Sequence, residues 1–254
     1  MRFTTVASSM LLAGSAIAAP ATRSEKMAKS RAARHSRPMQ KVDAPADQKT
    51  NDTEVSYSSN WSGAVLVGTD YTGVSAKFTV PTPSTAGSGA AWVGLDGDTC
   101  TTSILQTGVS WTKTAASTTY DAWYEWYPHA SIDFSGITIS AGDSIQSSVI
   151  ATSDDAGTAT IENLTTGKSV THTFTGERDA LCEYNAEWIV EDFEEGGSLV
   201  SFADYGSVEF TAAEATQSGS TVDTTGSTII DMRSGLSVES TCTASGSTVS
   251  CTYG

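Results

Sequence analysis

Residues 185–195 read NAEWIVEDFEE, and the alternation within this stretch decides the fold class that we expect. Successive side chains of a β-strand point to opposite faces, so a strand here has two distinct sides. One side carries Glu187, Ile189, Glu191 and Phe193, and the other carries Ala186, Trp188 and Val190. The pattern predicts a strand that covers a core on one face and lines an acidic surface on the other.

Residues 120–128 repeat this arrangement with aromatic rings. Alternation puts Asp121, Trp123, Glu125 and Tyr127 on one face, and Tyr124 and Trp126 on the other. Carboxylates that face a core without partners are costly, so we interpret the first face as a ligand-binding surface. Burial of both faces between stacked layers is the alternative. Trp92 and Asp96 share one face of another predicted strand, and Gln106 emerges from a fourth.

The rest of the body consists of short runs rich in β-branched residues, which Gly, Ser, Asp and Pro separate. The expected strands include residues 64–67, 75–80, 136–140, 145–152 and 169–174, with hairpin turns at 154–157 and 165–168. No window holds a long helical period. This pattern predicts an all-β fold, an antiparallel β-sandwich with one face curved into a groove.

The chain divides into three parts. Residues 1–19 combine a positive start, a short apolar run and an A-x-A exit, which predicts a signal peptide and a secreted, extracellular protein. The apolar run is too short to span a bilayer. Residues 20–54 are polar, basic and free of aromatic residues, so they cannot bury a core by themselves. Residues 55–254 are long enough for one substantial domain.

The charges of the basic arm and of the body are opposite. Beyond residue 54 the chain has five Lys and Arg residues against 24 Asp and Glu residues. This balance argues against nucleic acid and anionic membranes as partners. A basic propeptide on an acidic domain would loosen as the carboxylates protonate, which we state as a hypothesis.

An even number of cysteines in a secreted chain predicts disulfides. The short interval from Cys242 to Cys251 resembles a hairpin clip, which leaves Cys100 to pair with Cys182. The chain has no C-x-x-C and only two histidines in its body, so we expect neither a metal site nor a cofactor. Sequons at Asn51, Asn60 and Asn163 permit glycosylation.

Elimination narrows the chemistry to carboxylates. The chain contains no H-E-x-x-H, no G-x-S-x-G and no Asp-Thr-Gly or Asp-Ser-Gly. A glycosidase would use two of Glu125, Glu187 and Glu191, and a peptidase would need one carboxylate and one oxyanion donor. A carbohydrate-binding or adhesion module with the same surface is a third possibility. Composition and pattern leave these three alternatives open.

Four segments, residues 57–64, 91–106, 120–128 and 185–194, together resemble the glutamic peptidase (eqolisin) family. The resemblance covers residues 57–253. It implies a double β-sandwich of two seven-stranded antiparallel sheets, jelly-roll-like in type. It further implies endopeptidase activity in acid on protein and peptide substrates. Pepstatin is not expected to inhibit this activity. The family's layout implies a monomer whose basic propeptide acts as its inhibitor.

The same resemblance assigns roles to individual residues. Gln106, in an I-L-Q-T-G segment, and Glu191, the second Glu of an A-E-(aromatic)-I-(aliphatic)-E-D-F run, correspond to the catalytic pair. Residues that correspond to the substrate groove are Trp92, Asp96, Glu125 and Tyr127. Because its partner is a neutral amide, Glu191 needs no strongly raised pKa. Residues 195–198 lack a cysteine present in one branch of the family, so we expect a more mobile loop there.

Overall fold

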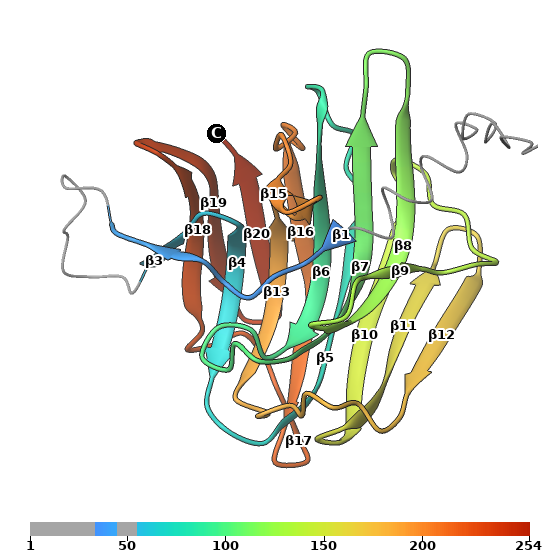
Figure 1. Cartoon of the computed structure of the whole chain (residues 1–254), viewed down its shortest axis with the longest axis vertical. Coiled ribbons are helices and arrows are strands. Elements are labelled where there is room, and N and C mark those ends of the chain that lie inside the picture. Colours follow the sequence, from blue (N-terminus) through green and yellow to red (C-terminus); the bar gives the residue numbers. More distant parts are fainter. Residues whose placement is uncertain (1–33, 45–54) are drawn as a thin grey trace, which may run out of the picture.

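The computed structural model describes residues 34–44 and 55–254, and every regular element in these ranges is a β-strand (Figure 1). The predicted signal peptide, the sequon at Asn51 and much of the basic arm lie outside the described residues. In chain order the strands are β1 (Arg34–His35), β2 (Lys41–Val42), β3 (Val55–Ser58), β4 (Trp61–Val67), β5 (Tyr71–Thr79), β6 (Gly87–Leu95), β7 (Ile104–Lys113), β8 (Thr118–Tyr127), β9 (Ile132–Asp133), β10 (Ser144–Ser153), β11 (Ala156–Asn163), β12 (Lys168–Phe174), β13 (Asn185–Glu191), β14 (Glu194–Glu195), β15 (Ser198–Leu199), β16 (Ser207–Gln217), β17 (Ser220–Val222), β18 (Thr228–Ser234), β19 (Ser237–Ser245) and β20 (Thr248–Tyr253).

The strands form two layers that are joined at one side. The first layer follows the order β12–β11–β10–β5–β16–β20–β19, and the second follows β18–β4–β13–β6–β7–β8–β9. Antiparallel pairing of β18 with β19 connects them, so hydrogen bonding runs from one layer into the other. The all-β antiparallel prediction is confirmed, apart from the parallel pair β3–β18. Two separate seven-stranded sheets are not confirmed, because the pairing is continuous.

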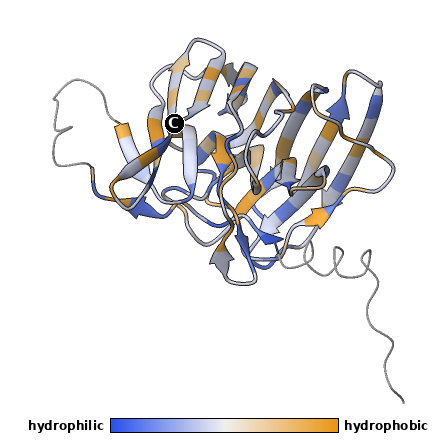
Figure 2. Ribbon diagram, turned by 90° about the horizontal axis from the view of Figure 1, so that it is seen from above, coloured by the Kyte–Doolittle hydropathy of each residue, from blue (hydrophilic) through white to orange (hydrophobic). Residues whose placement is uncertain are grey.

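The core between the layers matches the predicted alternation, which is visible along the strands in Figure 2. Trp188 and Val190 of β13 belong to the main apolar cluster, together with Trp126 of β8. Ile189 and Phe193 belong to a second cluster on the opposite face, with Trp92 and Trp123 among others. The second layer is therefore buried on both of its faces, and the face away from the core carries the polar residues singled out above.

Two sequence predictions differ in outcome. The turns at 154–157 and 165–168 join β10 to β11 and β11 to β12, as expected. The predicted strand at 136–140 is wrong, because these residues pair with no neighbour in the described structure. Ile139 is nevertheless buried and Ile137 packs on the core, so the apolar alternation of this segment reflects packing without a ladder.

Both predicted disulfides, Cys100–Cys182 and Cys242–Cys251, are present. Asn163 is fully buried, and its Nδ2 donates to Thr138 O and to Asp143 Oδ2. A glycan on that nitrogen is incompatible with this fold. In the described parts of the chain, no helix is long and apolar enough to cross a membrane.

Candidate active site

Cross-strand pairing arranges the polar residues of the second layer in a row. Glu187 on β13 pairs with Gly94 on β6, Gly94 pairs with Gln106 on β7, and Gln106 pairs with Glu125 on β8. Side chains of paired residues lie on the same face of a sheet. Glu191 follows Glu187 on this face of β13. We call this side of β4, β13, β6, β7 and β8 the site face.

Residues 34–44 of the basic arm lie along the site face, where Figure 1 shows them as the blue segment crossing the strands. At one end, β1 pairs with β14, and at the other, β2 pairs with β3. Between these strands, Met39 N donates to Gly97 O over 3.0 Å, and Gln40 N donates to Asn60 Oδ1 over 2.8 Å. The arm is therefore held by main-chain hydrogen bonds along its whole described length.

Glu191 is fully buried at the centre of this arrangement. Trp92 Nε1 donates to its Oε2 over 2.8 Å, and Trp61 Nε1 donates to its Oε1 over 3.3 Å. The two indole rings meet edge to face, with centroids 4.9 Å apart. Oε1 also accepts from Arg37 N of the arm at 3.2 Å. Two tryptophans thus fix the carboxyl group, and the arm caps it.

Gln106 and Glu125 hold the preceding residue of the arm. Gln106 Nε2 donates to the carbonyl oxygen of Ser36 over 3.2 Å, and Ser36 N donates to Glu125 Oε2 over 3.3 Å. Both side chains are buried. The Ser36–Arg37 peptide bond consequently lies between Gln106, which binds its oxygen, and Glu191, which binds its N–H.

Arg34 occupies a closed pocket beside this bond, with 4% of its side chain exposed. Its guanidinium donates to Ser110 Oγ at 2.6 Å, to Ser131 Oγ at 2.9 Å and to Asp133 Oδ1 at 3.1 Å. The group also lies 5.1 Å from the centroid of the Trp123 ring. Burial lowers the pKa of Arg34, and the nearby Asp133 opposes that effect. Among the described residues, the arm forms two further ion pairs, Arg37–Glu194 and Lys41–Asp98, whose basic side chains are more exposed than that of Arg34.

Burial dominates the electrostatics of the site. It raises the pKa of Glu191 to about 8, although the contacts of Ser36 and of the two indoles with the carboxyl group act in the opposite direction. This differs from the expectation of an ordinary pKa, because the neutral amide partner removes charge repulsion but not the cost of desolvation. Burial also raises the pKa of Glu125 and of Glu187 well above the usual range. With the arm in place, all three carboxyl groups are protonated in acid.

The structure places the four predicted groove residues differently from one another. Trp92 and Glu125 lie at the centre, as described, and the half-buried Tyr127 packs against the aromatic cluster of the site face. Asp96 has φ +70° and is buried, and its carboxylate accepts backbone N–H groups from residues 182–185. No hydrogen bond or ion pair joins it to residues 34–44, and its role in the substrate groove stays a prediction. Its cluster with Cys100 and Cys182 offers no thiolate to a metal, because those cysteines form a disulfide.

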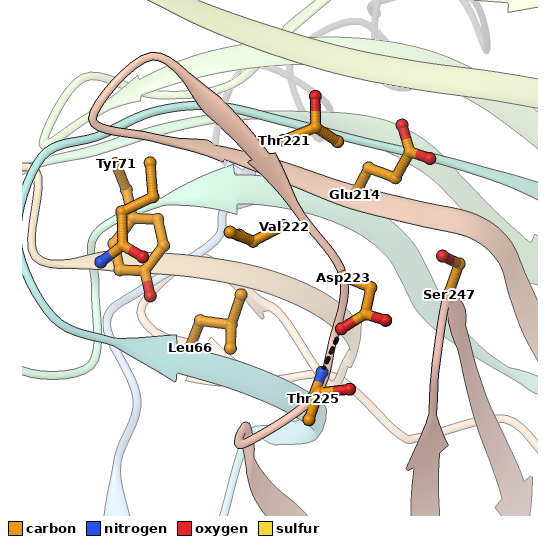
Figure 3. A pocket seen from close by; sticks show the side chains of 9 residues that line it. Leu66, Tyr71, Glu214, Thr221, Val222, Asp223, Thr225 and Ser247 are labelled. Carbon is orange, nitrogen blue, oxygen red and sulfur yellow. Dashed lines mark hydrogen bonds between the residues drawn. The ribbon is translucent and has the colours of Figure 1, made fainter.

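Another hollow lies away from this site, beside the hairpin of β16 and β17 (Figure 3). Its lining includes Glu214 and Asp223, and Asp223 Oδ1 accepts from Thr225 N at 2.9 Å. Asp223 is already engaged within its own turn, and none of the residues around Glu191 lines this hollow. We therefore place the functional site on the site face.

Residues 59–253 match the model of the Peptidase A4 family. The chain belongs to this family. The A4 peptidase described here is 49% identical to aspergillopepsin-2 of Aspergillus niger over 281 residues, which cover 100% of both chains. It is 46% identical to scytalidopepsin B of Scytalidium lignicola over 263 residues, again covering 100% of both chains.

Solved structures agree with this assignment. The A4 peptidase matches scytalido-glutamic peptidase in complex with a transition state analog inhibitor at a TM-score of 0.73 and 50% identity, covering 77% of this chain and 98% of that one. It matches aspergilloglutamic peptidase from Aspergillus niger at a TM-score of 0.64 and 59% identity, and the match covers 65% of this chain and 98% of that one. The resemblance to the eqolisin family is confirmed. The protein is a glutamic-type endopeptidase, which hydrolyses peptide bonds.

Sequence reasoning missed two parts of the A4 peptidase site. Trp61 lies in a segment that carried the family resemblance, but no pattern assigned its indole to Glu191. Ser110, Ser131 and Asp133 meet Arg34 from different strands and turns. Polar residues scattered in this way give no periodic signal, so only the folded chain brings them together.

Proposed function

We propose that Glu191 and Gln106 are the catalytic pair of this peptidase and that it cleaves protein substrates in acid. The observation that carries the proposal is the position of the Ser36–Arg37 peptide bond. Gln106 donates to its carbonyl oxygen and Glu191 accepts from its N–H, each over 3.2 Å. If a substrate peptide bond is held in the same way, the negative charge that develops on its oxygen lies beside the Gln106 amide. Its leaving nitrogen then lies beside the Glu191 carboxyl group.

The reaction follows from these two contacts. Ionised Glu191 takes a proton from a water molecule as the water oxygen bonds to the carbonyl carbon. The Gln106 NH2 group stabilises the negative charge on the former carbonyl oxygen, a contribution of about 3–4 kcal/mol by analogy with other oxyanion donors. Protonated Glu191 then gives its proton to the nitrogen, the C–N bond breaks, and a carboxylic acid and an amine leave. The two indole donors keep Glu191 in position throughout.

We infer that the arm inhibits the enzyme from the position of a substrate. It fills the space around Glu191 and caps the carboxyl group with Arg37 N. With the pKa of Glu191 at about 8 under the arm, the group is protonated in acid and cannot act as a base. Departure of the arm admits water and returns the pKa towards its ordinary value, which restores the base.

The remaining parts of the chain fit an exported precursor. We propose that residues 1–19 are a signal peptide, residues 20–54 a propeptide and residues 55–254 the mature domain, which acts outside the cell as a monomer. The two disulfides suit an oxidising compartment. Mass spectrometry of the protein from culture medium tests this division, and a mature chain that still begins within residues 1–19 would contradict it.

The proposed chemistry is tested by digestion of a denatured protein in acid, with pepstatin present. We expect the matured wild type to cleave, and Glu191→Gln and Gln106→Ala to lose activity by at least about a hundredfold. Glu209→Gln, an exposed carboxylate on β16, is the matched control and retains activity. Full activity of folded Glu191→Gln would remove Glu191 as the base. Inhibition of the wild type by pepstatin would contradict the proposed class of mechanism.

A further inference from the structure

The Gln106 amide has to face in one direction to bind a carbonyl oxygen. Its Nε2 donates to Ser36 O, which can only accept, so its Oε1 points elsewhere. Oε1 is buried and has no hydrogen-bond partner among the described residues. A buried amide oxygen without a donor is unfavourable, and an amide free to turn would present this oxygen to the substrate half of the time. Some group must hold the amide in its productive orientation.

Glu125 is the direct neighbour of Gln106. The two residues pair across β7 and β8, so their side chains leave the sheet side by side on one face. Glutamate and glutamine side chains have the same length and shape, so their terminal groups lie at one level. Both groups also bind the same arm residue, because Ser36 N donates to Glu125 Oε2 and Gln106 Nε2 donates to Ser36 O.

In both Gln106 and Glu125, the side-chain atom that lacks a hydrogen-bond partner is an oxygen. Glu125 Oε1, like Gln106 Oε1, is buried and lacks a hydrogen-bond partner among the described residues. Two bare oxygens on neighbouring side chains repel each other unless a proton lies between them. A neutral carboxyl group supplies that proton, since it is a donor through one oxygen and an acceptor through the other.

We propose that the neutral carboxyl group of Glu125 donates its proton to Gln106 Oε1 and so fixes the amide with Nε2 towards the substrate carbonyl. Glu125 is then a positioning residue that acts through Gln106, and the inference rests on the proposed role of Gln106. Ionised Glu125 would instead attract Nε2, turn the amide and remove the oxyanion donor. The proposal thereby gives the enzyme a reason to work in acid.

The charged groups around Glu125 are consistent with a neutral state. Burial raises its pKa, and Glu191 on β13 raises it further, while Ser36 N–H and Arg34 of the arm lower it. Ser36 and Arg34 belong to the arm. When the arm departs, the cation that favours ionised Glu125 departs with it and Glu191 ionises beside it, whereas the water that enters lessens the effect of burial.

Glu187 offers a matched comparison in the same row. It is buried, and both of its carboxylate oxygens lack hydrogen-bond partners among the described residues. Its neighbouring charges are Asp96 and Asp98, and its Oε1 lies over Gly94 of β6, the residue between it and Gln106 in the row. A general effect of removing a buried carboxyl group would appear at Glu187 as well, whereas a specific contact with the amide would not.

The test is the pH profile of kcat and KM of the matured enzyme with a fluorogenic peptide. Glu125→Gln carries an NH2 group that donates at every pH, so we expect the alkaline limb of kcat to move up by at least about one pH unit. In acid its kcat falls by about threefold, since an amide is a weaker donor than a carboxylic acid. Glu125→Met has no donor, and its kcat falls by about a hundredfold at all pH values with a smaller change in KM.

The outcomes separate the possibilities. A Glu125→Gln profile that superimposes on the wild type overturns the proposal, and so does an equal displacement by Glu187→Gln. If Gln106→Ala keeps its activity, both the proposed function and the positioning role of Glu125 fail. If Gln106→Ala is inactive while the Glu125→Gln profile is unchanged, only the positioning role fails. Side-chain ¹⁵N NMR of Gln106 in the wild type gives an independent reading, because its resonance must shift with the midpoint of the alkaline limb.

Discussion

Arg34 is the residue on which inhibition by the arm should depend most. Its guanidinium is 4% exposed and makes three hydrogen bonds, one of them to the carboxylate of Asp133. Truncating one partner of a buried, hydrogen-bonded charge pair costs about 2–5 kcal/mol. Asp133 is 25% exposed and can be rehydrated, so we take about 3 kcal/mol, near the lower end of this range. That value corresponds to a loss of affinity of about a hundredfold.

The assay is inhibition of the matured enzyme by a synthetic peptide of residues 20–54. Arg34→Ala should raise the inhibition constant of this peptide by about a hundredfold. Arg37→Ala is the matched control, because its side chain is 45% exposed and pairs with Glu194 at the surface. Such a pair contributes about 0.5 kcal/mol, or roughly a twofold change. Equal effects of the two substitutions, or a change of less than about fivefold for Arg34→Ala, would refute the reasoning.

Three further predictions concern the mature domain. Trp92→Phe removes the 2.8 Å hydrogen bond to Glu191 Oε2 and should lower kcat by about tenfold, measured beside an unchanged circular dichroism spectrum; an unchanged kcat would show that this indole does not hold the base. Gly108→Ala puts a methyl group against the backbone of Ala91 and the Cβ of Trp92, which should lower Tm by about 5 °C in a calorimetric scan; an equal Tm would contradict this packing. Burial raises the pKa of Asp192 to about 8, so its contribution to stability is present in acid and is lost between about pH 4 and pH 8. Asp192→Asn should therefore reduce the fall in Tm towards neutral pH, and an identical fall in both proteins would assign it to other groups.

The sequence predicted those parts of the fold and site that depend on local alternation. The two faces of β13 and β8 follow directly from the polar and apolar residues along each strand, and the apolar clusters confirm them. The strand expected at 136–140 failed because alternation reports burial, and Ile139 is buried without a neighbouring strand. Alternation also does not show how strands pair, so the continuous connection through β18 and β19 was not foreseen.

The site shows a similar division. Motif resemblance identified Gln106 and Glu191, and the structure brings both to one peptide bond of the arm. Resemblance also placed Asp96 in the groove, which stays a prediction, and the structure adds that its carboxylate anchors the backbone of residues 182–185. A carboxylate in a motif looks the same in sequence whether it binds substrate or backbone. Only the direction of its hydrogen bonds separates the two roles.

Two effects govern the docking of the arm, the protonation of Glu191 and ion pairing. Burial raises the pKa of Glu191 to about 8 with the arm docked, so on our proposal the docked state binds a proton that the open site releases as the pH rises from the ordinary carboxyl range. Within that interval, affinity falls with increasing pH by up to about tenfold per unit. The ion pairs of Arg34, Arg37 and Lys41 add an attraction between the arm and the body that salt screens.

Affinity should therefore fall as the pH rises from weak acid towards neutrality, in contrast to the simpler hypothesis that the arm only loosens as the pH falls. Inhibition constants of the peptide of residues 20–54, measured across pH at two salt concentrations, test this. Salt should weaken binding through the three ion pairs and leave in place the pH dependence that Glu191 causes. If the inhibition constant of the peptide instead decreases steadily towards neutral pH, ion pairing alone governs binding of the arm. Protonation of Glu191 then makes no contribution to its docking.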